Sequence, residues 1–586
     1  MITYKRLQAL LLKRFNIPRE RDFHKTVRSF TLAERAVFYF LIIIFVFSGV
    51  LLFLKVNSEF LIEIPIKGGT FSEGVVGNPR FINPALAISE ADKNLTSLVF
   101  SGLVRLNPDG SVINDLADSI EVSQNGLTYT VHLHEDAVFH DGQPITAEDV
   151  VFTIQKITDP VTKSPRRGNW EGVTVEKTGD YTLNFVLKGA YGPFINNLTI
   201  GILPKHIWKN VSDDEFSFSQ FNTLPVGSGP YKVVSVERNN GGIPNYYLLS
   251  PFEEVIGKAP FIENLEFKFY PSEEELISAY KSGSVRSFSG ISPDKVAELK
   301  NDPHIISSPL SRIFAVFFNQ NQSKVLAQKE VRRALNLAAP QEKIIKDVFY
   351  GYATPIDGPL PAGLFSWSTA KREIGLDERI IEAQEILSKA GWKLNEQTQV
   401  LEKKSGSSKM SLSFSISTGD APELRAVANK LIEAWGKLGA RVEVLVFETG
   451  DLNQNVIRPR RFDALLFGEV VGRDADVYPF WHSSQRNDPG LNVSLYANSR
   501  ADKYLETARS ANDPDTAEKN YKAFSEEVAT DLPAVFLYTP SFLYVLPDSV
   551  EAVSLGLLST PQDRFAGVRD WYIDTQKVWK IFTREN

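Results

Sequence analysis

The segment Gly472–Ser484 concentrates side chains whose types could bind a ligand. Two carboxylates, Asp474 and Asp476, lie two residues apart, and a carboxylate can pair with a cationic group. Arg473 precedes them, and its planar guanidinium can hold a carboxylate through two parallel hydrogen bonds. Aromatic side chains that suit a cleft wall follow at once: Tyr478, Phe480 and Trp481. Each residue also has a structural alternative, as a solvated acid, an internal salt bridge or a packed ring.

Three histidines, His132, His134 and His140, raise the possibility of a metal site, because the first two alternate on one face of an expected strand. Purely structural histidines are the simpler interpretation. The chain has no cysteine, which excludes disulfides, thiolate metal sites and a cysteine nucleophile. It also lacks the common sequence motifs of zinc proteases, serine hydrolases, dinucleotide sites and phosphate loops. We therefore expect no enzyme, no metal and no cofactor.

An uncharged apolar run, residues 36–54, predicts a transmembrane helix. At about 1.5 Å per residue it spans about 28 Å, close to the hydrocarbon thickness of a bilayer. Residues 1–35 hold nine basic against three acidic residues, which places this segment in the cytoplasm and the rest outside. No small-residue cleavage site follows, so we expect the span to remain as an anchor, with residues 55–65 as a stalk.

The remaining 520 or so residues predict an α/β architecture. Leu412, Phe414 and Ile416 alternate as in a half-buried strand, an amphipathic helix follows to Leu438, and residues 441–447 form the next strand. This is a βαβ unit whose strands should be parallel neighbours. A second unit covers residues 265–289. Two such units suggest two lobes with a cleft between them.

Several segments occur in a characteristic order along the chain: Leu98–Leu103, Asn114–Asp118, Asn125–His134, Phe139–Gly142, Thr146–Phe152, Gly227–Lys232, Phe317–Asn319, Val331–Leu335, Ala383–Trp392 and Asp531–Tyr538. Together they resemble the extracytoplasmic solute-binding proteins of family 5, the oligopeptide, dipeptide and nickel-binding proteins of ABC importers. The resemblance covers about residues 66–575.

The resemblance implies a type II periplasmic-binding-protein-like fold, three-lobed with a hinged ligand cleft. It implies lobe I over residues 66–95, 213–312 and 540–586, lobe II over 96–212, and lobe III over 313–539, with the ligand between lobes I and III. Two features depart from the family's pattern: the uncleaved membrane span, and Gly283-Ser-Val-Arg286 where the family often has Gly-Glu-x-Asp.

The resemblance also implies roles for individual residues. In peptide-binding relatives an aspartate of the 472–484 loop pairs with the ligand's amino terminus, and either Asp474 or Asp476 matches it. Asn78 and Arg80 match the lip of lobe I, where relatives contact ligand, although an ordinary turn would explain them equally well. For Tyr478, Trp481 and Arg473, ligand contact and internal packing or pairing both remain open.

The expected function is therefore a membrane-anchored, monomeric extracytoplasmic receptor that captures a short peptide by lobe closure and delivers it to an ABC permease. Alternatives are a non-peptide solute such as a nickel chelate or a sugar, a receptor or sensor without a permease, and an extracytoplasmic hydrolase. The net charge of −7 argues against nucleic-acid binding.

Overall fold

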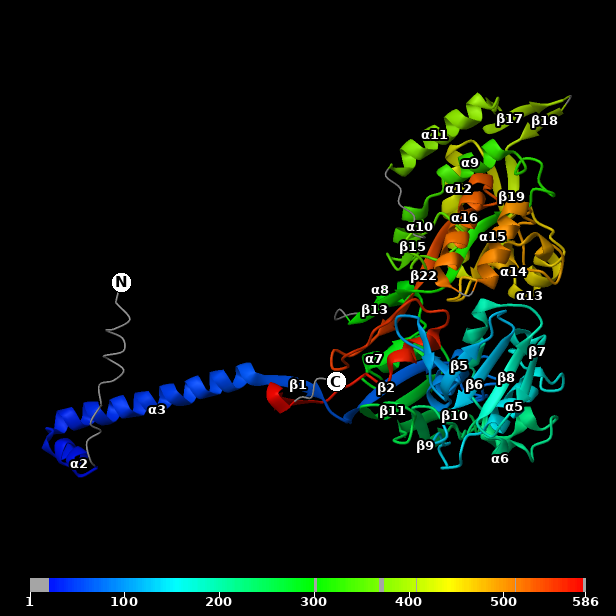
Figure 1. The fold of residues 1–586 in the computed structure, drawn as a ribbon. Helices are drawn as coiled ribbons and strands as arrows, with labels where there is room; N and C mark the ends of the chain where they lie inside the picture. The colour runs from blue at the N-terminus through cyan, green and yellow to red at the C-terminus, as the bar shows by residue number, and fades with distance from the viewer. Residues whose placement is uncertain (1–19, 300–302, 368–373, 407, 512, 583–586) are drawn as a thin grey trace, which may run out of the picture. The chain divides into compact units, whose positions relative to one another are not determined.

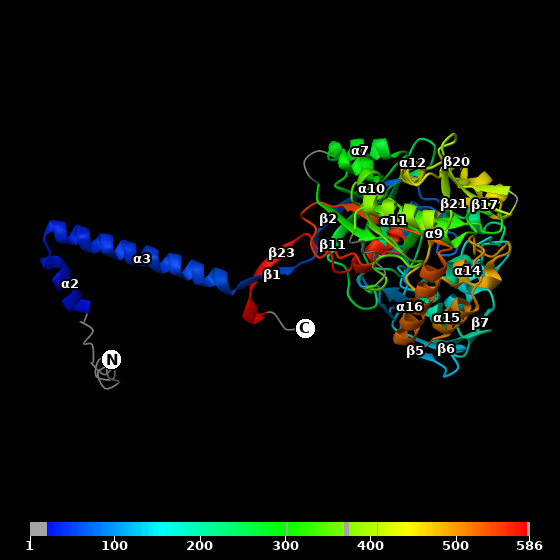
Figure 2. The ribbon, with the colours of Figure 1, turned by 90° about the horizontal axis from the view of Figure 1, so that it is seen from above.

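The protein is described by a computed structural model covering residues 20–299, 303–367, 374–406, 408–511 and 513–582. Most of the expected basic cytoplasmic segment, residues 1–19, lies outside the described residues. The chain divides into two compact units (Figures 1 and 2). One unit contains residues 1–66 together with 575–586, and the other contains residues 67–574.

The first unit is built on a long helix, α3 (Leu32–Phe60), preceded by α2 (Glu20–Ser29). Thr31 caps α3 through a reciprocal capping box with Glu34, so the helix begins four residues before the apolar run. None of its residues is buried, and it is the one helix among the described residues that is long and apolar enough to cross a membrane. The helix continues through residues 55–60, the first part of the expected stalk.

The rest of the stalk forms strand β1 (Leu61–Pro65), which pairs antiparallel with β23 (Thr575–Trp579), followed by a short 3-10 helix, η8 (Lys580–Phe582). The sequence analysis had assigned residues 575–586 to lobe I. In the structure residues 575–579 instead complete a two-stranded ladder with the segment that follows α3. Each strand of such a ladder supplies the main-chain partners that the other lacks.

A large mixed sheet runs through the second unit. Its strands, in spatial order, are β20 (Arg441–Phe447), β19 (Ser413–Gly419), β21 (Ala464–Val470), β14 (Arg312–Phe318), β22 (Ala534–Val545), β12 (Ser287–Ser289), β2 (Gly68–Val76), β11 (Ile262–Tyr270), β10 (Pro244–Pro251) and β9 (Tyr231–Arg238), with β13 (Ile305–Pro309) and β15 (Ala353–Pro355) also paired to β22.

Two chain segments cross between the two halves of this sheet. The first residues of β22 pair with β14, and its last residues pair with β12 and β13. The turn at Leu310–Ser311 joins β13 to β14 and is the second crossing. Figure 1 shows β22 between the part of the sheet that holds β2 and β11 and the part covered by α9 and α12. Two short crossings of this kind are the usual requirement for a hinge between lobes.

Smaller sheets complete the second unit. One consists of β5 (Ala117–Val122), β6 (Thr128–Leu133), β8 (Thr182–Leu187) and β7 (Val173–Lys177) in that order. The others are β3 (Val104–Leu106) with β4 (Val112–Asn114), and β16 (Lys393–Asn395), β17 (Val400–Ser405) and β18 (Ser408–Ser411).

The helices of this unit pack on these sheets. They are α4 (Glu90–Val99), α5 (Ala147–Thr158), α6 (Lys205–Trp208), α7 (Glu273–Lys281), α8 (Pro293–Ala297), α9 (Lys329–Leu337), α10 (Gln341–Asp347), α11 (Leu376–Lys389), α12 (Pro422–Lys437), α13 (Thr449–Asp451), α14 (Tyr478–Trp481), α15 (Ser499–Ser510) and α16 (Pro514–Asp531). Short 3-10 or π segments are η1 (Arg167–Trp170), η2 (Gly192–Thr199), η3 (Phe216–Phe218), η4 (Gln220–Asn222), η5 (Leu452–Ile457), η6 (Ser483–Gln485) and η7 (Pro561–Gly567).

The expected βαβ unit is confirmed, because β19 and β20 are parallel neighbours joined by α12. The other expected βαβ unit, residues 265–289, differs from the expectation because its strands β11 and β12 are not neighbours. Strand β2 lies between them and pairs parallel with both. Alternate residues of β14 enter two different cores. Val316 and Phe318 pack with α9 and α12, whereas Ile313, Ala315 and Phe317 pack with the segment after β21 and with α15 and α16.

Candidate ligand-binding site

The loop that carries most of the predicted site residues follows directly from the end of β21. The Val471 N–H donates to the Ser311 carbonyl (3.0 Å), and the Ser311 hydroxyl donates to the Gly472 carbonyl. Gly472 has φ +83°, and a Cβ at this position would lie 2.8 Å from Asp474 Oδ1. The loop is therefore fixed to the turn between β13 and β14, at one of the crossings between the halves of the main sheet.

Asp476 is buried and already has a cationic partner in the protein. Its Oδ2 lies 3.3 Å from Nε of Arg509, in the last turn of α15. The guanidinium carbon of Arg509 lies 4.8 Å from the ring centre of Tyr191 and 4.6 Å from that of Tyr478. The Tyr191 hydroxyl donates to the Asp476 carboxylate. Asp476 and Arg509 thus form a satisfied pair held between two aromatic rings.

Among the described residues no cation forms an ion pair with Asp474, although the charge of Arg509 partly opposes the rise of its pKa. Its Oδ1 accepts a hydrogen bond from the Asp476 N–H (3.3 Å). Burial, reinforced by the neighbouring Asp476 charge, raises the pKa of Asp474 to about 6. Burial also raises the pKa of Asp476, but Arg509 opposes that rise. When all three groups are ionised, Asp474, Asp476 and Arg509 leave one uncompensated negative charge, so the arrangement favours an additional cation.

Arg473 extends away from these acids toward a different part of the chain. Its Nη2 lies 3.4 Å from Oδ2 of Asp563, in η7, and its side chain is 9% exposed. Its Nε and Nη1 are buried without a hydrogen-bond partner in the structure. A buried guanidinium with two unused donors can accept an oxygen ligand at little additional desolvation cost.

A cavity of about 240 Å³ lies beside the Arg473–Asp563 pair. Asp563 lines it together with Arg166 and Lys93. Burial lowers the pKa of Arg166, and Asp563 opposes that shift. Burial and the charge of Arg166 lower the pKa of Lys93, and two nearby acids, Asp92 and Glu90, oppose that shift. Two cations that face one cavity repel one another, and an anionic group between them would relieve that repulsion.

Trp481 lies in the core. It is fully buried, and its indole packs against the rings of Phe317, Tyr496, Phe524 and Phe536 at centroid distances of 5.8–6.3 Å. Tyr478, three residues earlier, is only half-buried and stacks on His482 (4.1 Å) as well as on Arg509. The packing of Trp481 is that of a core residue, whereas ligand contact by Tyr478, whose ring contacts His482 and Arg509, stays a prediction.

Asn78 and Arg80 follow the carboxyl end of β2, where the Gly77 N–H donates to the Tyr270 carbonyl at the end of β11. The Arg80 N–H donates to Oδ1 of Asp92 (2.6 Å), and the Arg80 guanidinium lies over the ring of Phe81. Within the described part of the chain, no hydrogen bond or ion pair joins these two residues to the 472–481 loop. The placement of Asn78 and Arg80 at the ligand therefore stays a prediction.

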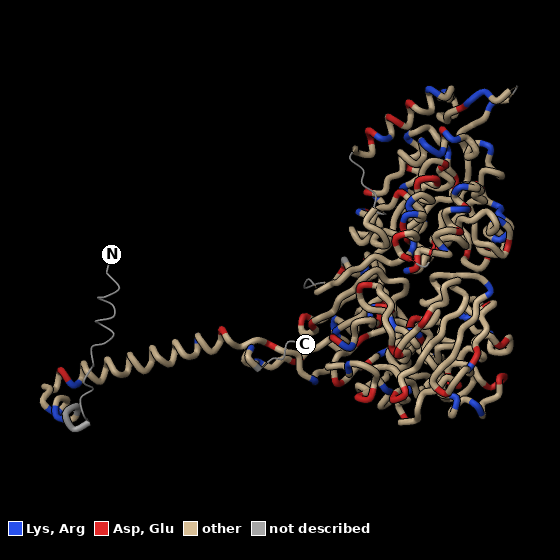
Figure 3. Tube along the Cα trace, viewed as in Figure 1, with Lys and Arg blue, Asp and Glu red and all other residues tan. Residues whose placement is uncertain are grey.

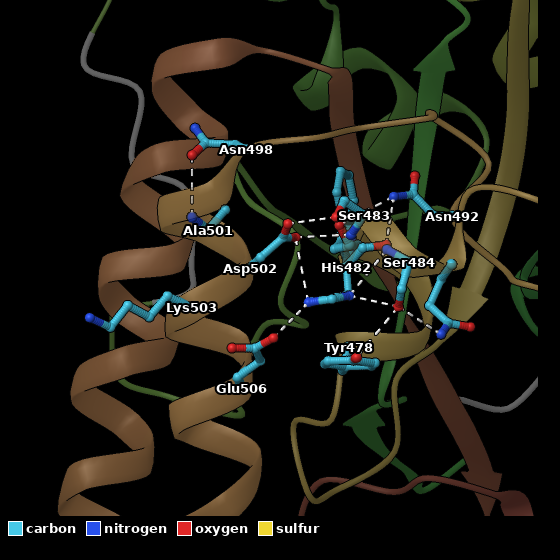
Figure 4. Close-up of polar contacts among 12 residues, drawn as sticks. Tyr478, His482, Ser483, Ser484, Asn492, Asn498, Ala501, Asp502, Lys503 and Glu506 are labelled. Atoms are coloured by element: carbon cyan, nitrogen blue, oxygen red, sulfur yellow. Dashed lines mark hydrogen bonds and ion pairs between the residues drawn. The ribbon is translucent and has the colours of Figure 1, made fainter.

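His482 connects the predicted loop to α15 (Figure 4). Its Nδ1 accepts from the Ser484 N–H (3.2 Å) and lies 2.7 Å from the Ser484 hydroxyl, while its Nε2 faces Glu506 (3.3 Å) and Asp502 (3.8 Å). The Ser483 hydroxyl also donates to Asp502 (2.6 Å). These contacts fix α14 to α15, and α15 in turn carries Arg509.

The Ser484–His482–Glu506 arrangement contains the residue types of a hydrolytic triad, which the sequence analysis did not find. Catalysis of acyl transfer needs N–H donors that are free to bind the developing oxyanion. Here the N–H of Ser483 donates to Asp502, that of Ser484 to His482, and that of Gln485 to the His482 carbonyl. The N–H groups around the Ser484 hydroxyl are therefore occupied by partners within the protein. The Ser484–His482–Glu506 contacts serve to hold the segment after α14 against α15.

The histidines at first considered for a metal have protein partners. His140 Nε2 lies 3.0 Å from the Gly229 carbonyl, and its Nδ1 accepts from the Gly227 N–H (3.3 Å). Burial lowers the pKa of His140 to about 4. His132 faces Thr182 (3.5 Å) and His134 faces Asp118 (3.9 Å). Among the described residues, no group of three or more His, Cys, Asp or Glu side chains could hold a metal ion.

Three residues of the site were missed by sequence reasoning: Tyr191, Arg509 and Asp563. Tyr191 and Arg509 lie on segments more than 300 residues apart, and no local pattern links them. Asp563 did carry a local signal, because Thr560 and Asp563 form a capping box at the start of η7, but that pattern predicts only a helix start.

Comparison with known proteins identifies the family. The family model described as "Bacterial extracellular solute-binding proteins, family 5 Middle" matches residues 111–490, and the chain belongs to this family. The oligopeptide-binding protein AppA of Bacillus subtilis is 29% identical over 524 residues, which cover 87% of this chain and 92% of AppA.

Solved structures agree with this assignment. That of the same AppA in complex with a nonapeptide matches with a TM-score of 0.64 and 27% identity, covering 87% of this chain and all of that one. The structure of NikZ from Campylobacter jejuni in complex with Ni(L-His) also matches with a TM-score of 0.64. Its sequence identity is 26%, and the match covers 86% of this chain and 99% of that one. The expected family and the type II periplasmic-binding-protein-like α/β fold are thus confirmed. The members of this family are substrate-binding proteins of transporters and not enzymes.

Proposed function

We propose that this protein is a membrane-anchored receptor that captures short peptides outside the cytoplasm and delivers them to an ABC permease. The observation that carries the peptide assignment is the uncompensated charge in the 472–478 loop. Asp476 is paired with Arg509, whereas Asp474 is half-buried, has a raised pKa and forms no ion pair with a cation among the described residues. A peptide ammonium placed at Asp474 would supply that cation, so we assign Asp474, and not Asp476, to the ligand's amino terminus.

The opposite end of the ligand would meet a cationic surface. Arg473 offers two unused donors, and Arg166 and Lys93 face the adjoining cavity. Together with Asp474 these groups could receive a molecule that is positive at one end and rich in carbonyl or carboxylate oxygens beyond it, which describes a peptide. The Bacillus subtilis relative carries a nonapeptide in its complex, which supports this ligand class.

Closure of the lobes would then trap the ligand. The predicted boundaries, 66–95, 213–312 and 540–586 for lobe I, 96–212 for lobe II and 313–539 for lobe III, place Tyr191 in lobe II and Asp476 with Arg509 in lobe III. Asp563 and Arg473 would likewise meet across lobes I and III. Contacts between lobes that form around a ligand favour the closed state by differential affinity. Asn78 and Arg80 would contact ligand only at the edge of the cleft.

The anchor assignment rests on α3, whose residues 36–54 are uncharged, and on the excess of basic residues before it. It places the binding unit on the extracytoplasmic side, where the family functions. A tether would keep a monomeric receptor near its permease at a high effective concentration. Extraction with alkaline carbonate tests this part: the intact protein should stay in the membrane fraction, and its release would contradict an integral anchor.

Titration calorimetry with matched peptides tests the ligand assignment. We expect the intact protein to bind a peptide with a free amino terminus roughly 10- to 150-fold more tightly than its N-acetylated form, because one hydrogen-bonded charge pair is lost. In Asp474→Asn the two peptides should bind with nearly equal, weakened affinity. Asp214→Asn, at an exposed position, is the matched control. Equal affinity of both peptides for the unmodified protein would contradict the proposal.

A further inference from the structure

The two-stranded ladder of β1 and β23 has an apolar end and a charged end. The pair nearest α3 is Leu61 opposite Trp579, and the next is Ile62 opposite Val578. The third pair is Glu63 opposite Lys577, whose charged groups lie 3.4 Å apart. At about 3.3 Å per residue, the ion pair lies about 7 Å farther from α3 than the first pair. The two pairs nearest the helix are therefore wholly apolar, and each of the three farther pairs contains a polar residue.

The end nearest α3 also exposes large apolar side chains. Phe60, the last residue of α3, is 53% exposed and stacks on Trp579 with 6.3 Å between ring centres and 23° between planes. Trp579 itself is 40% exposed. Because β23 runs antiparallel to β1, the chain after Trp579 continues back past the end of the ladder toward α3, and Ile581 in this extension is 72% exposed. Nothing in the described part of this unit covers these three side chains.

The distance of this surface from the apolar run fits the headgroup zone of a bilayer. Figure 3 shows α3 free of charged residues along most of its length, with charge reappearing near both ends. Six residues separate Leu54, the end of the uncharged run, from Phe60, about 9 Å of helix. A centred run of about 28 Å ends about 1 Å inside a hydrocarbon core of about 30 Å, so Phe60 lies about 8 Å beyond the core, at the outer limit of a polar zone about 5–8 Å thick. Lys55 and Glu59 lie within this stretch, which is consistent with headgroup level because charged side chains remain hydrated there.

We propose that Phe60, Trp579 and Ile581 form a second membrane contact, which seats the β1–β23 ladder in the outer headgroup region. Tryptophan is enriched at this depth because its ring is apolar while its N–H remains hydrated. The partner is the lipid surface itself, continuous with the bilayer that α3 crosses. The inference rests on the anchor part of the proposed function. Because residues 66–67 and 574–575 both connect the two units, the binding unit is joined to the membrane-bound unit by two chain crossings.

Quenching of tryptophan fluorescence by brominated lipid tests the contact. Trp579 is one of eight tryptophans and the one within residues 1–66 and 575–586. The intact protein and Trp579→Phe are reconstituted into vesicles of plain phosphatidylcholine and of phosphatidylcholine brominated near the headgroup end of its acyl chains. The emission difference between the two proteins reports Trp579 alone. In plain vesicles the intact protein should emit more than Trp579→Phe. In brominated vesicles this difference should be lost, because the lipid bromines quench Trp579.

Further arms keep the result interpretable. Trp367→Phe, which removes a half-buried tryptophan from the other unit, should leave the quenchable component in place. Ile581→Glu should restore part of the Trp579 emission in brominated vesicles. An emission difference that is the same in both kinds of vesicle overturns the proposal. Vesicle flotation separates the two hypotheses: protein that fails to float contradicts the anchor, whereas protein that floats without quenching of Trp579 contradicts the second contact alone.

Discussion

Arg509 Nε lies 3.3 Å from Asp476 Oδ2, although helix α15 and the loop after β21 are separate elements. Asp474 is then the acid of the two that has no ion pair among the described residues. The Asp476–Arg509 pair also joins the loop to Tyr191 through a hydroxyl hydrogen bond and a ring face. One arginine therefore has two consequences: it decides which carboxylate is available to a ligand, and it links two distant segments of the chain around the site.

Peptide affinity should depend on pH through Asp474. Its pKa is about 6 in the unliganded protein, and a ligand ammonium binds only the ionised form. At about pH 5 roughly one molecule in eleven is ionised, so affinity should fall about tenfold between about pH 7 and about pH 5. Calorimetry at both pH values measures this. Asp474→Asn should show no such dependence, and an equal fall in that variant would assign the effect to another group.

Stability of the unliganded protein should change in the opposite sense. Because the folded-state pKa of Asp474 lies above its ordinary value of 3.8, the folded protein binds more protons between about pH 4 and 6. Its free energy of unfolding therefore falls as pH rises through this window. Asp474→Asn should raise that free energy at pH 7 by about 1–3 kcal/mol and leave it unchanged below about pH 4. Denaturant unfolding of the intact protein checks this against Asp214→Asn, which should match wild type throughout.

Tyr191 should stabilise the liganded, closed arrangement. Its hydroxyl donates to Asp476, so Tyr191→Phe removes one hydrogen bond to a charged group and leaves the ring over Arg509. We expect a roughly 10- to 150-fold loss of peptide affinity, mostly as faster dissociation. Stopped-flow release of a labelled peptide measures it. Tyr181→Phe is the matched control. In an Asp476→Asn background the Tyr191 substitution should have little further effect, and a full additional loss would exclude this hydrogen bond as the cause.

The sequence predicted the elements that depend on local patterns. Residues 36–54 indicate a membrane span because nineteen uncharged residues have no alternative use on a protein surface, and the alternation at Leu412, Phe414 and Ile416 indicates β19. It could not predict that β2 separates β11 from β12, since insertion of a strand 200 residues away leaves no local trace. The pairing of β1 with β23 was missed for the same reason: its two strands lie more than 500 residues apart.

The candidate site itself stays a prediction. The resemblance to peptide-binding relatives led to the loop with Asp474 and Asp476, but the sequence could not choose between the two acids. That choice depends on Arg509, and hence on how α15 packs against α14 through His482. Trp481 illustrates a second limit, because an aromatic residue near a site has the same sequence signature whether it faces the ligand or the core.

Trp481 should contribute to stability and not to affinity. Its fully buried indole packs against Phe317 and Phe536, so Trp481→Phe leaves a cavity and should lower the free energy of unfolding by about 1–3 kcal/mol. Peptide affinity, measured under conditions where the variant is folded, should remain within about twofold, a change of under 0.5 kcal/mol. Trp367→Phe should lose less stability, because Trp367 is only half-buried. A Trp481 variant of unchanged stability but weakened binding would instead make this residue part of the ligand wall.

Glu469 provides a test of the core beneath the loop. It lies on β21 opposite Ile313, and its buried carboxyl oxygens make no hydrogen bond of ordinary geometry, although the Trp481 indole lies close enough to act on them. Burial raises the pKa of Glu469 well above its ordinary value, opposed only by the Trp481 indole.

Since the folded-state pKa of Glu469 exceeds the unfolded value, its contribution to stability is full in acid and is lost as pH rises toward and through the folded-state pKa. Glu469→Gln keeps the shape without the titration. It should therefore match wild type near pH 4 and become the more stable protein as pH increases above neutrality. Thermal unfolding across this range measures the difference, with the exposed Glu121→Gln as control. Parallel pH curves for wild type and Glu469→Gln would mean that this carboxyl ionises without cost, and hence that water or a cation reaches it.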